Sequence, residues 1–433
     1  MTRSKFGAIA LAALFVAAAC GAAATPTPSA TGTATAPPAT ATPEATPVAF
    51  TPPTDGFRVV EIKPGEPLHI AFWGVLSSAD VTLGEDSRRG VQVALEDRDY
   101  KYKGHDILLT SEDGQCLPAG GSVVGAKLAA DPTLVGLIGS SCSDETVGGI
   151  KAISDAGLTT ISPSNTRPAL TDPARGPEFA GYLRTAHSDA FQGKAVAEFA
   201  TSVLKVTTAA TIHDGSSYAQ ALQQVFVDNF TALGGTITIQ ESVTKDQPDM
   251  KSVLTRVAAT KPQFLYYPIF IASGGLITRQ APEVAGLAGV VLMGSDGMFS
   301  PDFIKAAGTA AKGMYLSSPD FSKFQAGYAA FLEKYKKGLT VVLSAFHAHA
   351  YDATNILFAA LDKVVVEGPD GTLYVPLKAL RDAIYATKDF PGVTGTLSCN
   401  ASGDCGAPLI AVYQITERET VELKWPPEKP VWP

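Results

Sequence analysis

The chain is poor in positive charge. Lys and Arg together number 34 against 42 Asp and Glu, which gives a formal net charge of −8. A nucleic-acid-binding surface needs clustered Lys and Arg, whereas Lys336 and Lys337 form only a pair at the end of an expected helix. Nucleic acid is therefore excluded as a partner. No repeat of fixed length indicates a solenoid.

The sequence also lacks the short motifs of catalysis. It contains neither the G-x-S-x-G nucleophile elbow nor the H-E-x-x-H zinc motif. Residues 120–125 have the glycine spacing of a phosphate-binding loop, but Ala126, Lys127 and Leu128 follow where Lys and then Ser or Thr are required. We therefore expect a protein that is not an enzyme and that uses no cofactor or metal.

No hydrophobic run is long enough to span a bilayer as a helix, which takes about 20 residues. The N-terminal run, residues 6–19, follows Arg3 and Lys5 and ends in small residues before Cys20. This pattern is typical of a secretory signal, here residues 1–19. The small residues before Cys20 resemble a bacterial lipoprotein box, which predicts that Cys20 carries lipid and anchors the chain at the outer face of the cell membrane. The alternative is ordinary cleavage beside an incidental cysteine.

Residues 20–55 are expected to form a linker. From residue 21 onward the segment consists mainly of Thr, Pro and Ala, with almost no charge. Such a segment cannot bury enough apolar surface to offset the entropy lost on ordering. Its prolines favour extended conformations, so we expect a semi-stiff spacer between the anchor and a globular body.

Cysteine is scarce, with five residues in the chain. No two have the C-x₂-C spacing usual in structural zinc sites, which argues against a four-cysteine metal site. Cys399 and Cys405 lie close together in a loop of small polar residues and are expected to pair. With Cys20 lipidated, Cys116 and Cys142 remain, and exported chains favour disulfides. The entropy model predicts that such a bond contributes about 3–4 kcal/mol.

The remainder has the composition of a folded body, because the chain is 45% hydrophobic and 18% charged. Its length exceeds the usual size of one core, so we expect two lobes. Strand-like and helical runs alternate, which predicts an α/β fold with parallel sheets and right-handed crossovers. Strands are expected at residues 68–75, 107–111, 134–139 and 158–161 in one lobe, and at 209–213, 236–243, 263–267 and 290–294 in the other, with a final one at 408–415. Helices are expected at residues 85–98, 119–130, 144–156, 190–205, 217–233, 249–260, 275–286, 322–337, 344–366 and 377–387.

Polar segments follow five of the strand-like runs. They are residues 140–144, 162–166, 186–189, 212–218 and 294–297. In an open α/β sheet, ligands bind outside the carboxyl ends of the strands. The hydroxyls and free N–H groups of these segments suit a carboxylate, and their acids suit an ammonium group. The pattern therefore indicates a site for a small zwitterion.

An ordered series of short motifs extends from residue 67 to about residue 416. They are residues 74–77, Cys116 with 138–143, 161–168, 184–186, 212–214 with Tyr218, 264–267 and 351–353. In this order and spacing the chain resembles the type I periplasmic binding proteins, specifically the branched-chain amino-acid receptors of ABC importers. It is also similar to the ligand-binding domains of metabotropic glutamate receptors.

The resemblance implies two Rossmann-like lobes joined by a multi-strand hinge, with a ligand cleft between them. The first lobe is expected at residues 67–186 and 319–393, and the second at residues 187–318 and 394–420. It also implies the pairing of Cys116 with Cys142.

The resemblance and the residue chemistry together suggest one set of ligand contacts in the first lobe. Ser143, near the start of an expected helix, would donate to a carboxylate, as free N–H groups there also do; alternatively it is a simple N-cap. Ser164 and Thr166 match a second carboxylate-binding loop, and a backbone carbonyl near Asn165 would face the ammonium group. The alternative for this segment is an ordinary turn.

A second set would come from the other lobe. Asp189 and Asp296 match acids that hold an ammonium group in relatives, and Tyr218 matches a tyrosine that covers the ligand's polar end. The alternatives are an N-cap for Asp189, a half-buried helix tyrosine for Tyr218 and a turn residue for Asp296. Leu83 stands where many relatives carry an aromatic ring, and residues 269–271 replace a tyrosine-containing stretch, so we expect an aliphatic pocket.

These observations favour a lipid-anchored, extracytoplasmic receptor that closes on a small aliphatic or polar amino acid and delivers it to an ABC permease. The alternative is a receptor for an amide, a urea or a carboxylate, or a sensor with no role in transport. If Asp189 and Asp296 both lie at the site, an ammonium ligand is favoured. If one lies at the surface, the alternative is favoured.

Overall fold

The structure is a computed structural model that describes residues 50–245 and 247–433. The predicted signal, Cys20 and most of the linker therefore lie outside the described residues. Residues 50–433 form one compact unit. Because that unit is not divided further, the residue limits predicted for the two lobes are not tested and stay a prediction. Within the described part, none of the helices combines the length and the apolar character that crossing a membrane requires.

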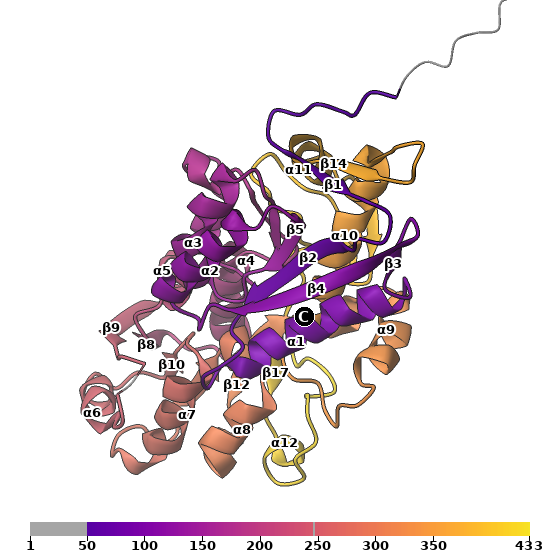
Figure 1. The fold of residues 1–433 in the computed structure, drawn as a ribbon. Coiled ribbons are helices and arrows are strands. Elements are labelled where there is room, and N and C mark those ends of the chain that lie inside the picture. Colours follow the sequence, from indigo (N-terminus) through magenta and orange to yellow (C-terminus); the bar gives the residue numbers. More distant parts are fainter. Residues whose placement is uncertain (1–49, 246) are drawn as a thin grey trace, which may run out of the picture. The chain divides into compact units, whose positions relative to one another are not determined.

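The first sheet has six strands in the order β3-β4-β2-β5-β6-β7, and all neighbours run parallel except β3 and β4. Every residue of β2 and β5 is buried. Parallel sheets carry helices on both faces, which explains why these strands are continuous apolar runs. The strands are β2 (Leu68–Gly74), β3 (Lys101–Tyr102), β4 (His105–Asp113), β5 (Leu134–Gly139), β6 (Thr160–Ser162) and β7 (Tyr182–Arg184). Helix α1 (Val81–Glu96) packs on α10 (His347–Val364), and α2 (Pro118–Ala130) packs on α3 (Ser143–Asp155) (Figure 1).

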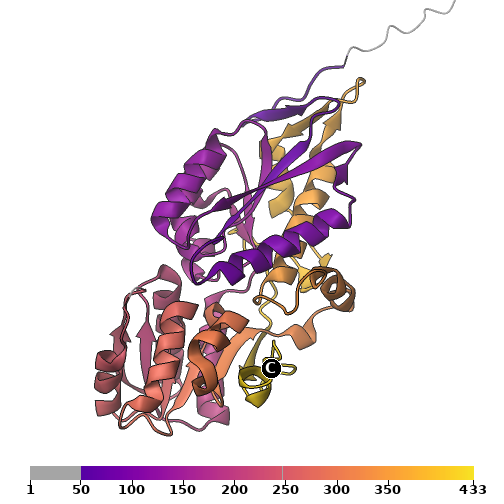
Figure 2. The same ribbon diagram turned by 60° about the horizontal axis from the view of Figure 1, so that its bottom comes forward.

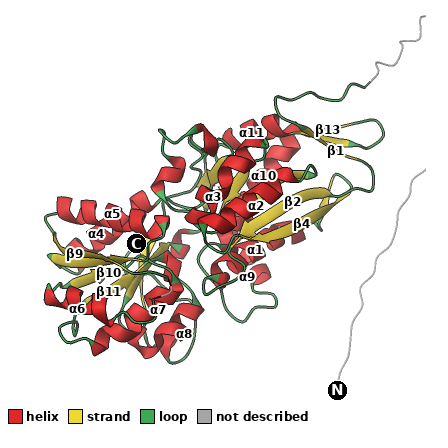
Figure 3. Ribbon diagram, turned by 60° about the vertical axis from the view of Figure 1, so that its left-hand side comes forward, coloured by secondary structure: helices red, strands yellow, loops and turns green. Residues whose placement is uncertain are grey.

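The second sheet also has six strands, in the order β17-β12-β11-β10-β8-β9, and only β17 runs antiparallel to its neighbour. Its strands are β8 (Thr208–His213), β9 (Thr236–Ser242), β10 (Phe264–Tyr266), β11 (Val291–Gly294), β12 (Tyr315–Pro319) and β17 (Ile410–Gln414). Helices α4 (Asp189–Glu198) and α5 (Ser217–Ala232) cover one face, and α6 (Lys251–Ala259), α7 (Ile271–Gln280) and α8 (Pro301–Ala307) cover the other (Figure 3).

The chain passes between the two sheets three times. It leaves the first sheet after β7, builds the second from β8 to β12, and returns to pack α10 beside the first sheet (Figure 2). It then crosses again to add β17 at the edge of the second sheet. The remaining elements are β1 (Val59–Ile62), β13 (Val366–Glu367) and β14 (Leu373–Pro376) in a small sheet, the hairpin of β15 (Phe390–Gly392) and β16 (Gly395–Leu397), and helices α9 (Gly327–Tyr335), α11 (Leu377–Tyr385) and α12 (Glu417–Thr420).

The α/β fold with two mainly parallel sheets is confirmed, but the prediction of four strands in each lobe is wrong. Strands β3 and β7 extend the first sheet, and β12 joins the second. Helix α7 begins at Ile271, four residues before the predicted start at residue 275. Its glycines allow close packing: an added Cβ would lie 2.0 Å from Met298 Sδ at Gly274 and 2.5 Å from Ala306 Cβ at Gly275. Here packing against α8 overrides the low helix propensity of glycine.

Candidate functional site

The carboxyl ends of both sheets contribute to one small cavity. Its lining residues come from α1, from the loops after β5, β6 and β11, from α5, and from the loops that precede α7 and α10: Leu83, Ser141, Cys142, Ser143, Ser164, Tyr218, Phe270, Asp296, Gly297 and Phe346. The cavity volume is about 10 Å³, which is the lower limit for a single water molecule. A larger molecule can enter only if the surrounding elements move apart.

The start of α3 forms one wall of the cavity. Ser143 is the first helical residue and Cys142 is the N-cap, so the alternative that Ser143 is the N-cap is wrong. The first N–H groups of a helix have no partner within the helix and favour an anion. The Cys116–Cys142 disulfide is formed, and Cys142 brings it to the same wall.

A buried glutamate that was not predicted from the sequence bonds to the backbone of this wall. Glu145 accepts hydrogen bonds from the backbone N–H groups of Cys116, Ser141 and Cys142. Burial raises the pKa of Glu145 to about 7, although these three bonds favour the charged form. Its carboxylate therefore ties the disulfide loop to the helix start. An acid in the first helical turn is the only signal in the sequence that could have identified it.

The three predicted residues of the loop after β6 have different surroundings. Ser164 lines the cavity and its hydroxyl donates to the Ser141 carbonyl at 2.8 Å. Asn165 is fully buried behind the cavity, where Nδ2 donates to the Ser140 carbonyl at 3.1 Å. Thr166 is also buried outside the lining, and its carbonyl accepts from the Asp189 N–H at 2.8 Å. Only Ser164 of the three therefore borders the cavity.

Asp296 and Tyr218 meet at the opposite wall. The Tyr218 hydroxyl donates to Asp296 Oδ1 at 2.8 Å and lies 2.7 Å from the Ser295 hydroxyl. Tyr218 is 4% exposed, so the alternative of a half-buried tyrosine is wrong, whereas Asp296 is 3% exposed and does begin a short turn, Asp296–Met298. Burial, with Asp296 and Asp189 nearby, raises the pKa of Tyr218 well above its ordinary value. Tyr218 is therefore a neutral hydrogen-bond donor to the carboxylate.

Gln192, on α4, supports Asp296 from behind. Its amide donates to Asp296 Oδ1 at 2.7 Å and to Ser317 Oγ at 2.9 Å, while its carbonyl oxygen lies 2.7 Å from His187 Nε2. His187 must therefore donate from Nε2, and burial lowers its pKa below the ordinary value. The sequence analysis missed Gln192, although a residue three positions after Asp189 on a helix shares its face.

Asp189 is a fully buried carboxylate. Neither of its oxygens has a partner at normal hydrogen-bond geometry among the described residues, although the Thr166 hydroxyl and Arg184 lie close enough to favour its charged form. Burial and the nearby Asp296 raise the pKa of Asp189 well above its ordinary value. The side chain that caps α4 is that of Ser188, which accepts from Ala190 N–H, so the alternative that Asp189 is the N-cap is wrong. Asp189 itself is not among the lining residues.

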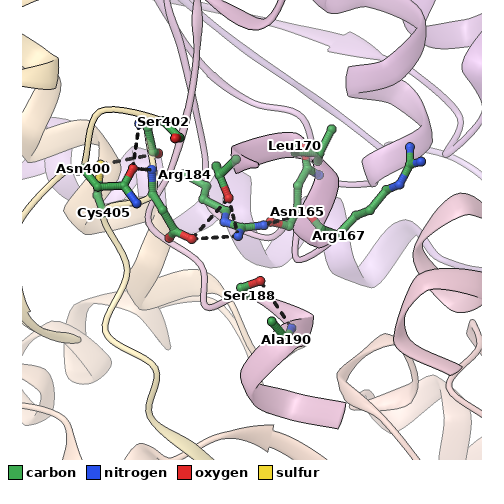
Figure 4. A network of polar contacts seen from close by, with 12 residues as sticks. Asn165, Arg167, Leu170, Arg184, Ser188, Ala190, Asn400, Ser402 and Cys405 are labelled. Carbon is green, nitrogen blue, oxygen red and sulfur yellow. Dashed lines mark hydrogen bonds and ion pairs between the residues drawn. The ribbon is translucent and has the colours of Figure 1, made fainter. Parts of the chain in front are cut away.

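The buried cation near Asp189 is already paired. Arg184, at the end of β7, is fully buried and contacts Asp404 at 2.8 Å (Figure 4). Its guanidinium also donates to the Arg167 carbonyl at 2.9 Å and to Thr171 Oγ1 at 2.6 Å. The loop that carries Asp404 is closed by the Cys399–Cys405 disulfide. Asp189 and Asp296 therefore form an acidic pair whose charge no lining residue neutralises.

The apolar wall differs from the sequence prediction. Leu83 lines the cavity, as expected, but Phe270 and Phe346 lie there as well. The expectation of an aliphatic pocket is therefore wrong. Phe270 lies within residues 269–271, and its ring packs on Tyr218 with centroids 5.2 Å apart. Phe346 precedes α10, far along the sequence from any strand end, so no local pattern could have placed it at the site.

Hydrogen bonds join the elements around the cavity. Asp80, before α1, accepts from the Ile271 N–H at 3.2 Å, and Asp144 of α3 accepts from the Ser217 N–H at 3.2 Å. Lys245 donates to the Cys116 carbonyl at 3.1 Å. Each bond links an element beside the first sheet to one beside the second. Among the residues that the structure describes, no cluster of His, Cys, Asp or Glu has the composition of a metal site.

The family model described as periplasmic binding protein matches residues 67–417. The chain is 25% identical over 354 residues to the Leu/Ile/Val-binding protein homolog 3 of Brucella melitensis, with 81% of this chain and 91% of that protein covered. A Streptococcus pneumoniae branched-chain amino acid transporter substrate-binding protein, in complex with isoleucine, aligns with a TM-score of 0.73 at 22% identity, over 85% of this chain and all of that one.

A solute-binding protein of an ABC transporter from R. palustris, in complex with benzoate, aligns with a TM-score of 0.68 at 18% identity, over 81% of this chain and 93% of that one. Both structures have the two-sheet arrangement described above. Because the family match covers both sheets and every element that lines the cavity, the chain belongs to the periplasmic binding protein family, in its type I form.

Proposed function

We propose that this protein is the extracytoplasmic substrate-binding component of an ABC importer and that it holds a small α-amino acid between two lobes. One observation carries the proposal: Asp296 lines the cavity, Asp189 is buried close to it, and the buried cation nearby, Arg184, is paired with Asp404. Two buried acids close together, at a cavity with no Lys or Arg among its lining residues, favour a cationic ligand group. An α-ammonium group supplies one positive charge and three donors.

The other end of the ligand has neutral partners. No Lys, Arg or His is among the residues that line the cavity. A ligand carboxylate would therefore bind the hydroxyls of Ser143 and Ser164 and the free N–H groups at the start of α3. Asn165 and Thr166 support this arrangement from behind, because Asn165 braces the Ser140 loop and Thr166 positions Asp189.

The relatives support an amino acid over other ligands. The Streptococcus pneumoniae protein has isoleucine bound, and the Brucella melitensis protein is a Leu/Ile/Val-binding protein homologue. The benzoate complex shows that the fold also accepts a carboxylate without an amine, which is the basis of the alternative function. The acidic pair disfavours a carboxylate without an amine as the ligand of this chain, because it would repel the unpaired negative charge.

Ligand capture would proceed by closure of the two lobes. The cavity of about 10 Å³ is too small to admit an amino acid without opening. The bonds from Asp80 to Ile271 and from Asp144 to Ser217 would break in the open form and re-form around the ligand. Hinge closure of this kind is stabilised by contacts from both sides. The closed form would then be recognised by a membrane permease.

A thermal-shift screen tests the ligand assignment, because a ligand that binds the native state raises its stability by mass action. Free amino acids should raise Tm, whereas neutral amides without an amine, urea and simple carboxylates should leave it unchanged. A screen in which amides, urea or carboxylates raise Tm and free amino acids do not would favour the alternative function.

The membrane anchor is a separate part of the proposal. Cys20 follows a short apolar run and precedes the linker rich in Thr, Pro and Ala, so lipidation at Cys20 would tether the receptor near a permease. A Cys20→Ser variant expressed in cells should move from the membrane fraction to the soluble fraction. Retention of that variant in the membrane fraction, at the level of the parent, would show that Cys20 is not the anchor.

A further inference from the structure

One hydroxyl at the cavity has no partner. Ser141 lines the cavity, is 1% exposed, and its Oγ makes no hydrogen bond within the described part of the chain. Two other lining hydroxyls differ, because Ser164 Oγ is bonded to the Ser141 carbonyl and Tyr218 is bonded to Asp296, while the Ser143 hydroxyl is already assigned to the ligand carboxylate. A buried hydroxyl without a partner is costly, and an alanine would fill almost the same space without that cost.

The backbone leaves room for this side chain. A Cβ added at Gly74 would lie 2.1 Å from Ser141 Oγ and 3.1 Å from Ser141 Cβ. Gly74 ends β2, so the hydroxyl lies against the end of a buried strand and has little freedom to turn away. Only a glycine at position 74 leaves space for the Ser141 side chain where it lies in the structure.

Ser141 and Leu83 both line the cavity, and neither belongs to the acidic pair. Gly74 is followed by Val75, and an added Cβ at Gly84 would lie 1.7 Å from the Val75 carbonyl oxygen. Gly84 is next to Leu83, so the segment that follows Gly74 packs closely against the helix that carries Leu83. Asp296 is held at the other wall by Tyr218 and Gln192. With these residues assigned to the ammonium group, and Ser143 and Ser164 to the carboxylate, Ser141 is the lining hydroxyl that remains for the ligand side chain.

We propose that Ser141 selects the ligand side chain, and that the substrates are small amino acids with a hydroxyl or amide group there. This inference rests on the proposed function. Phe270, Phe346 and Leu83 would contact the aliphatic part of such a side chain, while Ser141 Oγ exchanges a hydrogen bond with its polar group. A site built to hydrogen-bond a hydroxyl rejects an analogue that lacks it, because the site's own polar group is then left unpaired.

L-threonine and L-valine provide a matched pair of probes, because they differ by a hydroxyl in place of a methyl group. Isothermal titration of the full folded protein should give an affinity for threonine at least about tenfold higher than for valine. In Ser141→Ala the preference should disappear, through weaker threonine binding and unchanged or tighter valine binding. Ser318→Ala removes another buried, unpartnered hydroxyl that is not at the cavity, and it should keep the preference of the parent.

The outcomes separate this inference from the proposed function. Equal affinity of the parent for threonine and valine would overturn the role of Ser141 and leave amino-acid binding intact. If Ser141→Ala weakened the binding of threonine and valine equally, the Ser141 hydroxyl would bind the carboxylate that both ligands share. This result would also overturn the inference. If neither amino acid nor any other α-amino acid binds the parent, the proposed function fails, and this inference fails with it.

Discussion

At the scale of single residues, charge balance dominates the site. Within the described residues Asp189 has no partner at normal hydrogen-bond geometry, and burial with the nearby Asp296 raises its pKa well above the ordinary value despite the opposing Thr166 hydroxyl and Arg184. A charged carboxylate in this position is unfavourable without a cation. Burial therefore favours the protonated form of Asp189 in the ligand-free protein, and an ammonium group beside it would favour the charged form instead.

This exchange predicts that amino-acid binding releases a proton and strengthens as pH rises. Titration calorimetry in buffers of different ionisation enthalpy should show the release in the parent, because the observed enthalpy then depends on the buffer. Asp189→Asn removes the titrating group and should bind with no proton release. An observed enthalpy independent of the buffer in the parent would contradict the assignment of Asp189.

Glu145 gives a second prediction at this scale, for stability rather than binding. Its pKa is raised to about 7 in the folded protein from an ordinary value of 4.5. The folded state therefore binds the Glu145 proton more tightly than the unfolded state does. The stability that this proton contributes is fully present below pH 4.5 and is lost as pH rises through 7. The loss is on the order of 3 kcal/mol in the free energy of unfolding.

Urea unfolding of the ligand-free protein at a series of pH values measures this contribution. Glu145→Gln should be less stable at low pH by about 1–3 kcal/mol, because the amide cannot accept all three N–H bonds. Its stability should fall less steeply between pH 4.5 and 7 than that of the parent. The exposed Glu333→Gln serves as the control and should follow the parent. A Glu145→Gln variant with the full slope of the parent would contradict this role.

At the scale of elements, short contacts between helices decide whether the site stays closed. Asp144 in the first turn of α3 accepts from the N–H of Ser217, the first residue of α5. We propose that this bond exists only in the closed form. The apparent affinity for a ligand depends on the population of the binding-competent form, so a contact that never touches the ligand can still change affinity.

Asp144→Ala should therefore weaken amino-acid binding by about threefold to tenfold, which corresponds to one hydrogen bond of about 1 kcal/mol. Calorimetry measures the affinity, and small-angle scattering should show a more open ligand-free molecule. Asp155→Ala, at the other end of the same helix, removes an exposed pair with Lys151 and should leave affinity unchanged. Equal affinities for Asp144→Ala and the parent would show that the contact does not control closure.

The elements also show what the sequence can and cannot reveal. Strand β5 has the predicted limits because Leu134–Gly139 is a continuous apolar run between polar segments. Strand β12 was not predicted, because Tyr315–Pro319 contains two serines and a proline and becomes a strand only through pairing with β11 and β17. Strand propensity depends on such neighbours. The same holds for the site. Ser143 and Asp296 follow strand-like runs, so their place at the cavity could be predicted, whereas only the tertiary fold brings Gln192 and Phe346 to it.

At the scale of the whole molecule, two disulfides constrain the chain. Cys116–Cys142 closes a separation of 26 residues and Cys399–Cys405 a separation of 6. The entropy of closing a loop grows with its length, so the first bond should contribute about 3.5 kcal/mol and the second about 2.3 kcal/mol. The first lies at the cavity and the second in the loop that pairs with Arg184.

Double alanine variants test this ranking by urea unfolding. Cys116→Ala with Cys142→Ala should lose more stability than Cys399→Ala with Cys405→Ala. The first variant should also bind amino acids more weakly, because Cys142 lines the cavity. Peptide mapping without reductant should find only the two native pairs, and a peptide linking Cys116 to Cys399 would contradict the fold at this point.

The central claim is that an α-ammonium group binds between Asp189 and Asp296. The most direct test is calorimetry with matched ligands that differ only in that group: L-valine against 3-methylbutanoate, and L-threonine against 3-hydroxybutanoate. We predict that the favoured amino acid binds, that its counterpart without the amine does not, and that Asp296→Ala weakens amino-acid binding by at least about tenfold. Equal binding of an amino acid and its counterpart without the amine, or an Asp296→Ala variant with the affinity of the parent, would contradict the account.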